Sequence, residues 1–203
     1  TEDVPTYESL ADPKLKGKLC SRSGAHPYNL SLVSSLIAHD GEAKTEEWAR
    51  GVVANFARAP KGGDTDQIKS VAAGECGVAV SNTYYLARLI RSDKVEDRRL
   101  MERVGIVWPN QAGHGTHINI SGGGMVKTSK NQESAVKFLE YLASDEAQRY
   151  FADGNNEWPV VAALNTNNQA LDAMGKFKAD TLPISALAKN VVAAQKLLDR
   201  AGY

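Results

Sequence analysis

Residues 77–89, GVAVSNTYYLARL, decide the fold of this chain. The short apolar run from Val78 to Val80 predicts a buried strand. Asn82 and Thr83 then offer side chains suited to a helix N-cap, and apolar residues continue beyond them at helical spacing. The stretch therefore predicts a strand that leads directly into a helix.

Two adjacent tyrosines, Tyr84 and Tyr85, fall in the first turn of this expected helix, just past the carboxyl end of the strand. Open α/β sheets place their ligand sites at such junctions, and helix N-termini favour negative charge. The pair can therefore supply two phenolate ligands for a hard metal ion. The alternative is aromatic packing at the junction, which is the more common role of such a pair.

A second strand–loop–helix unit precedes this stretch. Leu19 to Ser21 predicts a short strand, residues 22–28 form a loop with Gly and Pro, and an amphipathic helix runs from Asn29 to the Asp40-Gly41 pair. Tyr28 lies where this loop meets its helix. Because strands and helices of this length alternate along the chain, the sequence predicts parallel βαβ units.

The remaining elements follow from periodicity and from capping residues. We expect a short helix after Thr6, a helix over Thr45–Phe56 with Thr45 as N-cap, a helix capped by Asp64, Thr65 or Asp66 and ended by Gly74, a charged helix or surface excursion over Arg91–Arg103, a strand over Val104–Trp108, an extended segment over His117–Ser121, a helix from Asn131 past Leu142, a short helix over Asp145–Phe151, and a final helix over Leu187–Leu198.

The composition excludes several classes of protein. Basic and acidic residues both number 24, so the formal net charge is zero, which argues against binding to nucleic acid or to an anionic membrane. No apolar run approaches the ~18 residues of a membrane-spanning helix. The two cysteines, Cys20 and Cys76, lack zinc-site spacing, and the residues alone leave open whether they are free thiols or one disulfide.

Three tyrosines thus occupy comparable positions: Tyr28 lies at one loop–helix junction, and Tyr84 and Tyr85 lie at another. In neighbouring βα units of a parallel sheet, such junctions line the same crevice. Tyrosinate is a ligand for ferric iron, and three phenolates would neutralise a trivalent ion. Arg22, in the Tyr28 loop, can provide the cation that favours ionised phenols, although alone it would be interpreted as a surface arginine. None of the four histidines is expected to be an obligatory ligand.

Four segments carry a family resemblance: residues 21–29 (SRSGAHPYN), 74–76 (GEC), 81–85 (SNTYY) and 156–160 (NEWPV). With them, the chain from about Thr6 to its C-terminus resembles the ferric-iron-binding proteins of bacterial ABC importers, especially the tyrosine-rich branch of cyanobacteria and their relatives. The resemblance implies a lobe of the periplasmic-binding-protein type II fold, in the α/β class, with a mixed, mainly parallel sheet flanked by helices. It also implies Tyr28, Tyr84 and Tyr85 as ligands of Fe(III).

Some members of that family hold a synergistic anion through a Ser-Gly-Ala loop and two asparagines. Here Ser23-Gly24-Ala25 and Asn82 are similar, but Asp64 stands where the other asparagine is expected. A carboxylate at that position would repel phosphate. We therefore hypothesise that Tyr28 takes the place of the anion and that metal binding needs no phosphate.

The resemblance also implies a two-lobed clamp, of which this sequence matches mostly the second lobe. We expect residues 1–114 and 164–203 in the second lobe, and residues 115–163 as a hinge strand plus a remnant of the first lobe. Such a remnant would expose apolar side chains, including Phe138, Leu139 and Leu142. The chain is then expected to be a fragment, to pair with a missing N-terminal lobe or a second chain, or to place the remnant differently.

The family finally implies an exported protein, periplasmic or lipid-anchored, in which Cys20 and Cys76 are joined in the oxidising compartment. Its partner would be the membrane permease of an ABC importer, and its role metal delivery. Catalysis is not expected, because no Ser/His/Asp or paired-carboxylate arrangement is present. The alternatives are a lobe of the same fold that binds another trivalent metal or a small anion, and a truncated lobe without useful affinity.

Overall fold

The computed structural model describes residues 4–161 and 164–203. The start of the expected second lobe and the expected boundary at residue 163 therefore lie outside the described residues. The elements, in chain order, are the 3-10 turns η1 (Glu8–Ala11) and η2 (Pro13–Leu15), β1 (Leu19–Cys20), α1 (Pro27–Asp40), α2 (Glu42–Ala54), α3 (Asp64–Ala73), β2 (Val78–Ala79), α4 (Thr83–Ile90), α5 (Val95–Met101), α6 (Gln132–Leu142), α7 (Asp145–Asn155), α8 (Gln169–Ala173) and α9 (Ile184–Ala201).

The two strands form a parallel pair, with Leu19 opposite Val78 and Cys20 opposite Ala79, and Phe56 forms an isolated parallel bridge to Leu19. The predicted α/β class with parallel pairing is confirmed, although the sheet is small in the described part. The disulfide between Cys20 and Cys76 is present, with the two Cα atoms 5.8 Å apart. It links the last residue of β1 to a residue two positions before β2.

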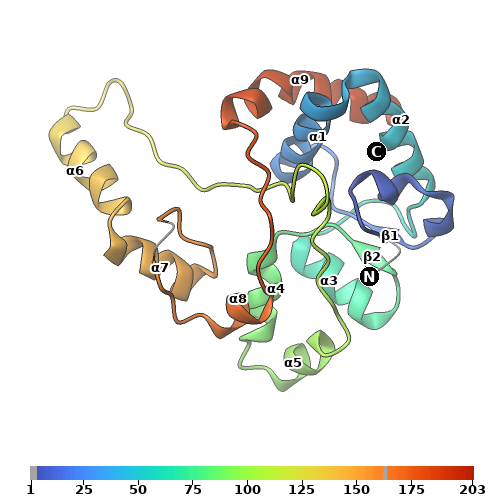
Figure 1. Ribbon diagram of the computed structural model, residues 1–203, viewed down its shortest axis with the longest axis horizontal. Coiled ribbons are helices and arrows are strands. Elements are labelled where there is room, and N and C mark those ends of the chain that lie inside the picture. The colour runs from blue at the N-terminus through green and yellow to red at the C-terminus, as the bar shows by residue number, and fades with distance from the viewer. Residues whose placement is uncertain (1–3, 162–163) are drawn as a thin grey trace.

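Helices cover the strand pair from two sides (Figure 1). On one side α1, α2 and α9 pack together over a core that includes Leu19, Leu36 and Leu197, all nearly inaccessible to solvent. On the other side α3, α4 and α5 share a smaller cluster around Ile68 and Leu89. These two cores fix the strands and therefore the loops at their carboxyl ends.

The helix α9 reaches this core from far along the sequence. Its Leu197 and Leu198 are buried against residues of α1 and α2. The chain leaves the body after Thr116, forms α6 and α7, and returns through α8 and residues 178–180 (Figure 1). We call the outgoing chain around residues 114–119 and the returning chain around residues 178–180 the crossing segments. They meet at a parallel bridge between Thr116 and Ala179. The described helices include none that is both long and apolar enough to cross a membrane.

Several expectations about single elements were wrong. Val104–Trp108 forms no strand, because Ile106 and Trp108 pack their side chains against α4 and α8 instead of joining the sheet. The second helix begins at Glu42 rather than after Thr45, whose hydroxyl donates to the Gly41 carbonyl from within the helix. Gly63, rather than an acidic side chain, occupies the N-cap position of α3.

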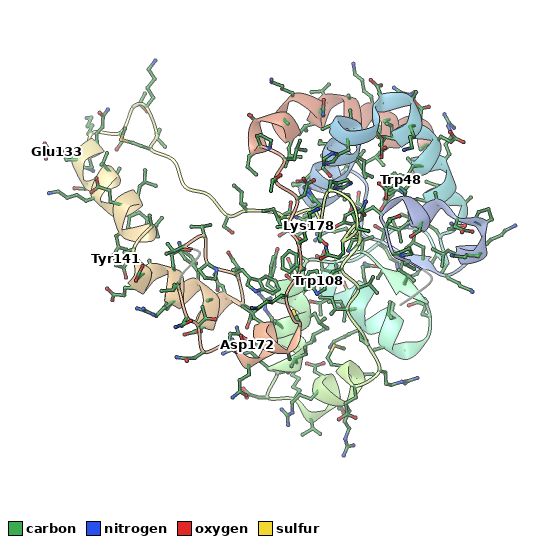
Figure 2. The ribbon with its side chains drawn as sticks, in the orientation of Figure 1. Trp48, Trp108, Glu133, Tyr141, Asp172 and Lys178 are labelled. Carbon is green, nitrogen blue, oxygen red and sulfur yellow. A yellow bond between two sulfur atoms is a disulfide. The ribbon has the colours of Figure 1, made fainter. Side chains whose placement is uncertain are left out.

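The α6 and α7 helices project away from the body, and Figure 2 shows Glu133 and Tyr141 out on this projection. Phe138 is 60% exposed, whereas Leu139 and Leu142 are half-buried. The expected exposure therefore holds for Phe138 and is weaker for the two leucines. The exposed large apolar side chains of α6 are Val136, Phe138 and Tyr141.

Candidate metal centre

The strand pair places two loops side by side at its carboxyl end. Because β1 and β2 are parallel, both carboxyl ends point the same way, so the loop that ends at Tyr28 lies beside the Ser81–Tyr85 segment. The disulfide between Cys20 and Cys76 joins the same two strand segments covalently. The edge of the sheet therefore brings together residues that lie more than 50 positions apart in the sequence.

Tyr28 is fixed by the start of α1. Pro27 occupies the first turn, where its missing N–H costs nothing, and His26 is the N-cap. The Nδ1 atom of His26 accepts a hydrogen bond from the Tyr28 backbone N–H at 3.3 Å, and the two rings meet edge-on with centroids 4.4 Å apart. The histidine thus orients the Tyr28 backbone and ring.

Tyr84 and Tyr85 lie in the first turn of α4, as predicted. The Tyr84 hydroxyl donates to the Tyr28 hydroxyl at 2.7 Å, and the rings of Tyr84 and Tyr85 are 4.4 Å apart. All three side chains are half-buried, so they remain open to solvent on one side. The structure brings the three tyrosines that the sequence singled out into one cluster.

The cluster disfavours ionised phenols without a bound cation. Burial, followed by the hydrogen bond to Tyr28, raises the pKa of Tyr84 far above its ordinary value. The hydrogen bond from Tyr84 lowers the pKa of Tyr28, but the interactions with Tyr85, burial and the Asp64 charge together raise it. Both phenols therefore keep their protons at neutral pH until a positive charge replaces them.

Arg22 and Asp64 stand beside the tyrosines as an ion pair. The guanidinium of Arg22 lies 4.9 Å from the centre of the Tyr28 ring and donates from Nη1 to Asp64 Oδ1 at 2.6 Å. The other carboxylate oxygen of Asp64 accepts from the Asn82 backbone N–H at 2.8 Å. Asp64 is almost fully buried, and its two hydrogen bonds connect the Tyr28 loop to the Tyr84 loop.

The Ser23-Gly24-Ala25 turn contains an internal hydrogen bond and packs against Tyr203. The Ala25 backbone N–H donates to the Ser23 hydroxyl at 3.3 Å. A Cβ on Gly24 would lie 2.7 Å from Cδ1 of Tyr203, which explains why glycine stands there. Ser23 and Ala25 are exposed, so the turn lies at the rim of the cluster.

Asn82 occupies the N-cap position of α4 but makes no side-chain capping bond, contrary to expectation. Its Oδ1 atom accepts from Nδ2 of Asn119 in the crossing segment at 2.9 Å. Its Nδ2 atom is buried and finds no hydrogen-bond partner among the described residues. An unsatisfied buried donor next to the tyrosines suits a ligand oxygen.

Two asparagines that organise this region were not singled out from the sequence. Asn29 is buried, and its Nδ2 atom donates to the carbonyls of Arg22 and Ser23 at 3.0 and 3.1 Å, which holds the loop in shape. Asn119 reaches Asn82 only through the crossing of the chain. The signal for Asn29 was its place directly after Tyr28, whereas sequence offered none for Asn119.

The other three histidines contact groups outside the tyrosine cluster. His39 and His114 stack with ring centroids 3.8 Å apart near Asp180, and His117 contacts Ser31. The tyrosine cluster therefore offers phenol oxygens, one cation and one free amide donor. Such a donor set favours a hard, highly charged metal ion over a soft one.

A family model described as bacterial extracellular solute-binding protein matches residues 2–179. The chain belongs to this family. Among curated relatives, this solute-binding protein is 46% identical to "Iron uptake protein A1" of Synechocystis sp., over 100% of its own length and 56% of that relative.

Solved structures agree with the family. A Trichodesmium protein (IdiA, FutA) in complex with iron and citrate is 51% identical with a TM-score of 0.95, covering 100% of this chain and 64% of the other. The ferric binding protein from Campylobacter jejuni is 42% identical, also with a TM-score of 0.95, and is matched over 63% of its length. This solute-binding protein thus spans a little over half of the curated relative and less than two thirds of either solved chain.

Proposed function

We propose that this chain binds ferric iron through the phenolate oxygens of Tyr28, Tyr84 and Tyr85. The convergence of these side chains, with the hydroxyls of Tyr84 and Tyr28 only 2.7 Å apart, carries the proposal. Three phenolates neutralise a trivalent ion, and tyrosinate is a ligand that ferric iron accepts. The iron-binding relatives named above support the same metal.

The surroundings favour the charged, metal-bound state. Tyr84 and Tyr85 lie at the positive end of α4, and Arg22 faces the ring of Tyr28. Asp64 holds Arg22 in place, so the guanidinium stays close to the phenolates. We assign Arg22, Asp64, Asn82 and the Ser23-Gly24-Ala25 turn to the shell around the ligands.

Binding without a synergistic anion is the second part of the proposal. The buried Asp64 carboxylate holds the Arg22 guanidinium in a 2.6 Å ion pair, so that cation is not available to bind a second anion. Tyr28 then supplies the ligand oxygen that an anion would otherwise provide. Ferric affinity measured with and without phosphate or carbonate tests this part of the proposal. A strict requirement for either anion would contradict it.

In the cell, we propose that the chain serves as the iron-binding lobe of the solute-binding component of an iron(III) ABC importer. It would act in the periplasm, deliver Fe(III) to a membrane permease and catalyse no reaction. We propose residues 1–114 and 164–203 as the second lobe and residues 115–163 as hinge and first-lobe remnant. The exposed apolar side chains of α6 favour pairing with a further lobe or chain.

The test is a titration of the whole chain with ferric nitrilotriacetate, followed by visible absorption. A phenolate-to-iron charge-transfer band that saturates at one equivalent supports the proposal, and its absence contradicts it. Parallel titrations with Ga(III) and Al(III), followed by the ultraviolet absorption of ionised tyrosine because these ions give no visible band, separate iron from other trivalent metals. Competition against a stronger chelator then measures affinity, and a band that vanishes at low chelator concentration would favour the alternative of a truncated lobe without useful affinity.

A further inference from the structure

A second group of metal-ligating side chains lies away from the tyrosines, where the chain crosses out of and back into the body. His39 comes from the last turn of α1, His114 from the turn before Thr116, and Asp180 from the returning segment. One ligand atom from each lies within 4.8 Å of the others. None of the three takes part in the proposed ferric site.

Both imidazoles are directed at the same carboxylate oxygen. His39 Nε2 is 2.7 Å from Asp180 Oδ2, and His114 Nδ1 is 3.5 Å from that same atom. The Nδ1 atom of His114 is buried and has no hydrogen-bond partner among the described residues. A buried nitrogen without a partner calls for an explanation, and a cation between the three groups provides one.

The backbone holds two of these residues firmly. The Thr116 N–H donates to the Lys178 carbonyl and the Asp180 N–H donates to the Thr116 carbonyl, both at 2.8 Å. Gly115 adopts φ +103°, and a Cβ there would lie 2.7 Å from the Ala179 carbonyl oxygen, so the two segments touch directly. Figure 2 shows Lys178 in this central crossing region. His114 and Asp180 are therefore placed before any ligand arrives.

We propose that His39, His114 and Asp180 form a second metal site, for a divalent ion of the zinc type. Two imidazoles and one carboxylate are the donors that Zn²⁺ and Co²⁺ prefer, whereas Mg²⁺ and Ca²⁺ prefer all-oxygen sites. His39 is partly exposed, so the site has an entry path, and Asp180 is buried. A solvent molecule completes the coordination.

Metal binding requires a small rearrangement of the two rings. They are stacked with an interplanar angle of 12°, whereas ligands at about 2.0–2.2 Å from one ion must splay so that each lone pair points at it. The His39–Asp180 hydrogen bond must open for the same reason. The stacked pair is thus the metal-free arrangement, and its loss is observable.

Two polar side chains face Nε2, the ring nitrogen of His114 that would not bind the metal. Glu8 Oε1 is 3.9 Å from His114 Nε2, and Asn110 Nδ2 donates to that nitrogen at 3.1 Å. When Nδ1 binds metal, the proton of His114 lies on Nε2, so the Asn110 amide must turn away from that nitrogen and Glu8 must move closer to accept a hydrogen bond from it. The neighbouring His117 stays neutral, because burial lowers its pKa to about 4, and its Nε2 contacts Ser31 rather than the site.

A bound ion would tie the end of α1 to both crossing segments. The experiment is a Zn²⁺ titration of the untagged chain at pH 7.5 against a chromophoric chelator, with Co²⁺ ligand-field absorption as a second readout. We expect one equivalent to bind, amide exchange at Thr116 and Asp180 to slow, and the thermal midpoint to rise. Glu8→Gln should weaken Zn²⁺ binding about tenfold. His39→Gln and His114→Gln, which remove ligands, should each weaken it more.

The controls separate this site from the proposed ferric site. His117→Gln changes a neighbouring histidine outside the site, and Tyr84→Phe removes a ferric ligand, so both should bind Zn²⁺ as the unchanged chain does. Unaltered binding in His39→Gln and His114→Gln, or loss of binding in Tyr84→Phe, would overturn the proposal. Failure to bind Fe(III) would leave this result unaffected, because no residue is shared.

Discussion

The Tyr84 hydroxyl donates a 2.7 Å hydrogen bond to the Tyr28 hydroxyl, although the two residues stand 56 positions apart. Each belongs to the first turn of its own helix, and the two helices follow adjacent parallel strands. The bond is therefore a direct consequence of strand pairing. Replacing the two hydroxyl protons by one metal ion would preserve this convergence and remove the cost of ionising neighbouring phenols.

Tyr84→Phe removes one phenolate and should abolish or strongly weaken the ferric charge-transfer band. The same change at Tyr85 should do likewise, since both rings lie side by side in α4. The matched control is Tyr150→Phe, because Tyr150 is 73% exposed and lies on the projecting α7 helix. Equal bands in Tyr84→Phe and Tyr150→Phe would argue against tyrosine ligation.

Ferric affinity should rise steeply with pH. The pKa values of Tyr84 and Tyr28 are raised in the metal-free chain, so both phenols are protonated near neutrality and metal binding releases their protons. Release of these two protons increases the logarithm of the affinity by about two per pH unit. Competition with a chelator of known protonation, measured across several pH values, gives this slope. A flat profile would contradict phenolate ligation.

Asp64→Asn should destabilise the chain and change its response to anions. Removing the carboxylate leaves the half-buried Arg22 charge without its 2.6 Å partner, which costs about 3 kcal/mol in the free energy of unfolding. The freed guanidinium can then bind phosphate, so ferric affinity should become sensitive to phosphate. Urea unfolding and anion-dependent titration measure both effects. Asp172→Asn, at an exposed position, should alter neither.

Removal of the disulfide should destabilise the folded chain without rearranging it. The bond closes a segment with a sequence separation of 56, for which chain entropy gives about 4 kcal/mol. We expect the Cys20→Ser/Cys76→Ser double variant to unfold at lower urea concentration, and dithiothreitol to shift the unchanged chain similarly. The strand pairing should survive, because Leu19 and its neighbours remain buried. An unchanged unfolding midpoint would be the contrary result.

Stability should also fall in alkali through Tyr203. Burial raises the pKa of Tyr203 to about 12, outweighing the hydrogen bond with Ser21, which lowers it. The unfolded chain loses this proton near pH 10, so the stabilisation is complete below pH 10 and is lost as pH rises to about 12, at about 1.4 kcal/mol per pH unit. Tyr203→Phe should flatten the slope of unfolding free energy in this range. Tyr150→Phe, with its exposed ring, should leave that slope intact.

The sequence alone determined which local units form. The apolar run before Asn82 and the helical spacing after it were sufficient for β2 and α4, because both signals lie within a few residues. Tyr28, Tyr84 and Tyr85 were singled out for the same reason, since each follows a short strand. The prediction of Thr45 as an N-cap was wrong, because a threonine inside a helix can also donate its hydroxyl hydrogen bond to a carbonyl of the preceding turn.

Only the tertiary structure decided what these units face. Strand pairing set the contact between Tyr28 and Tyr84, and the start of α3 brought the buried Asp64 to Arg22. The crossing segments alone brought His114 to Asp180 and Asn119 to Asn82. Such contacts depend on where distant segments meet in space, and local periodicity carries no information about that meeting.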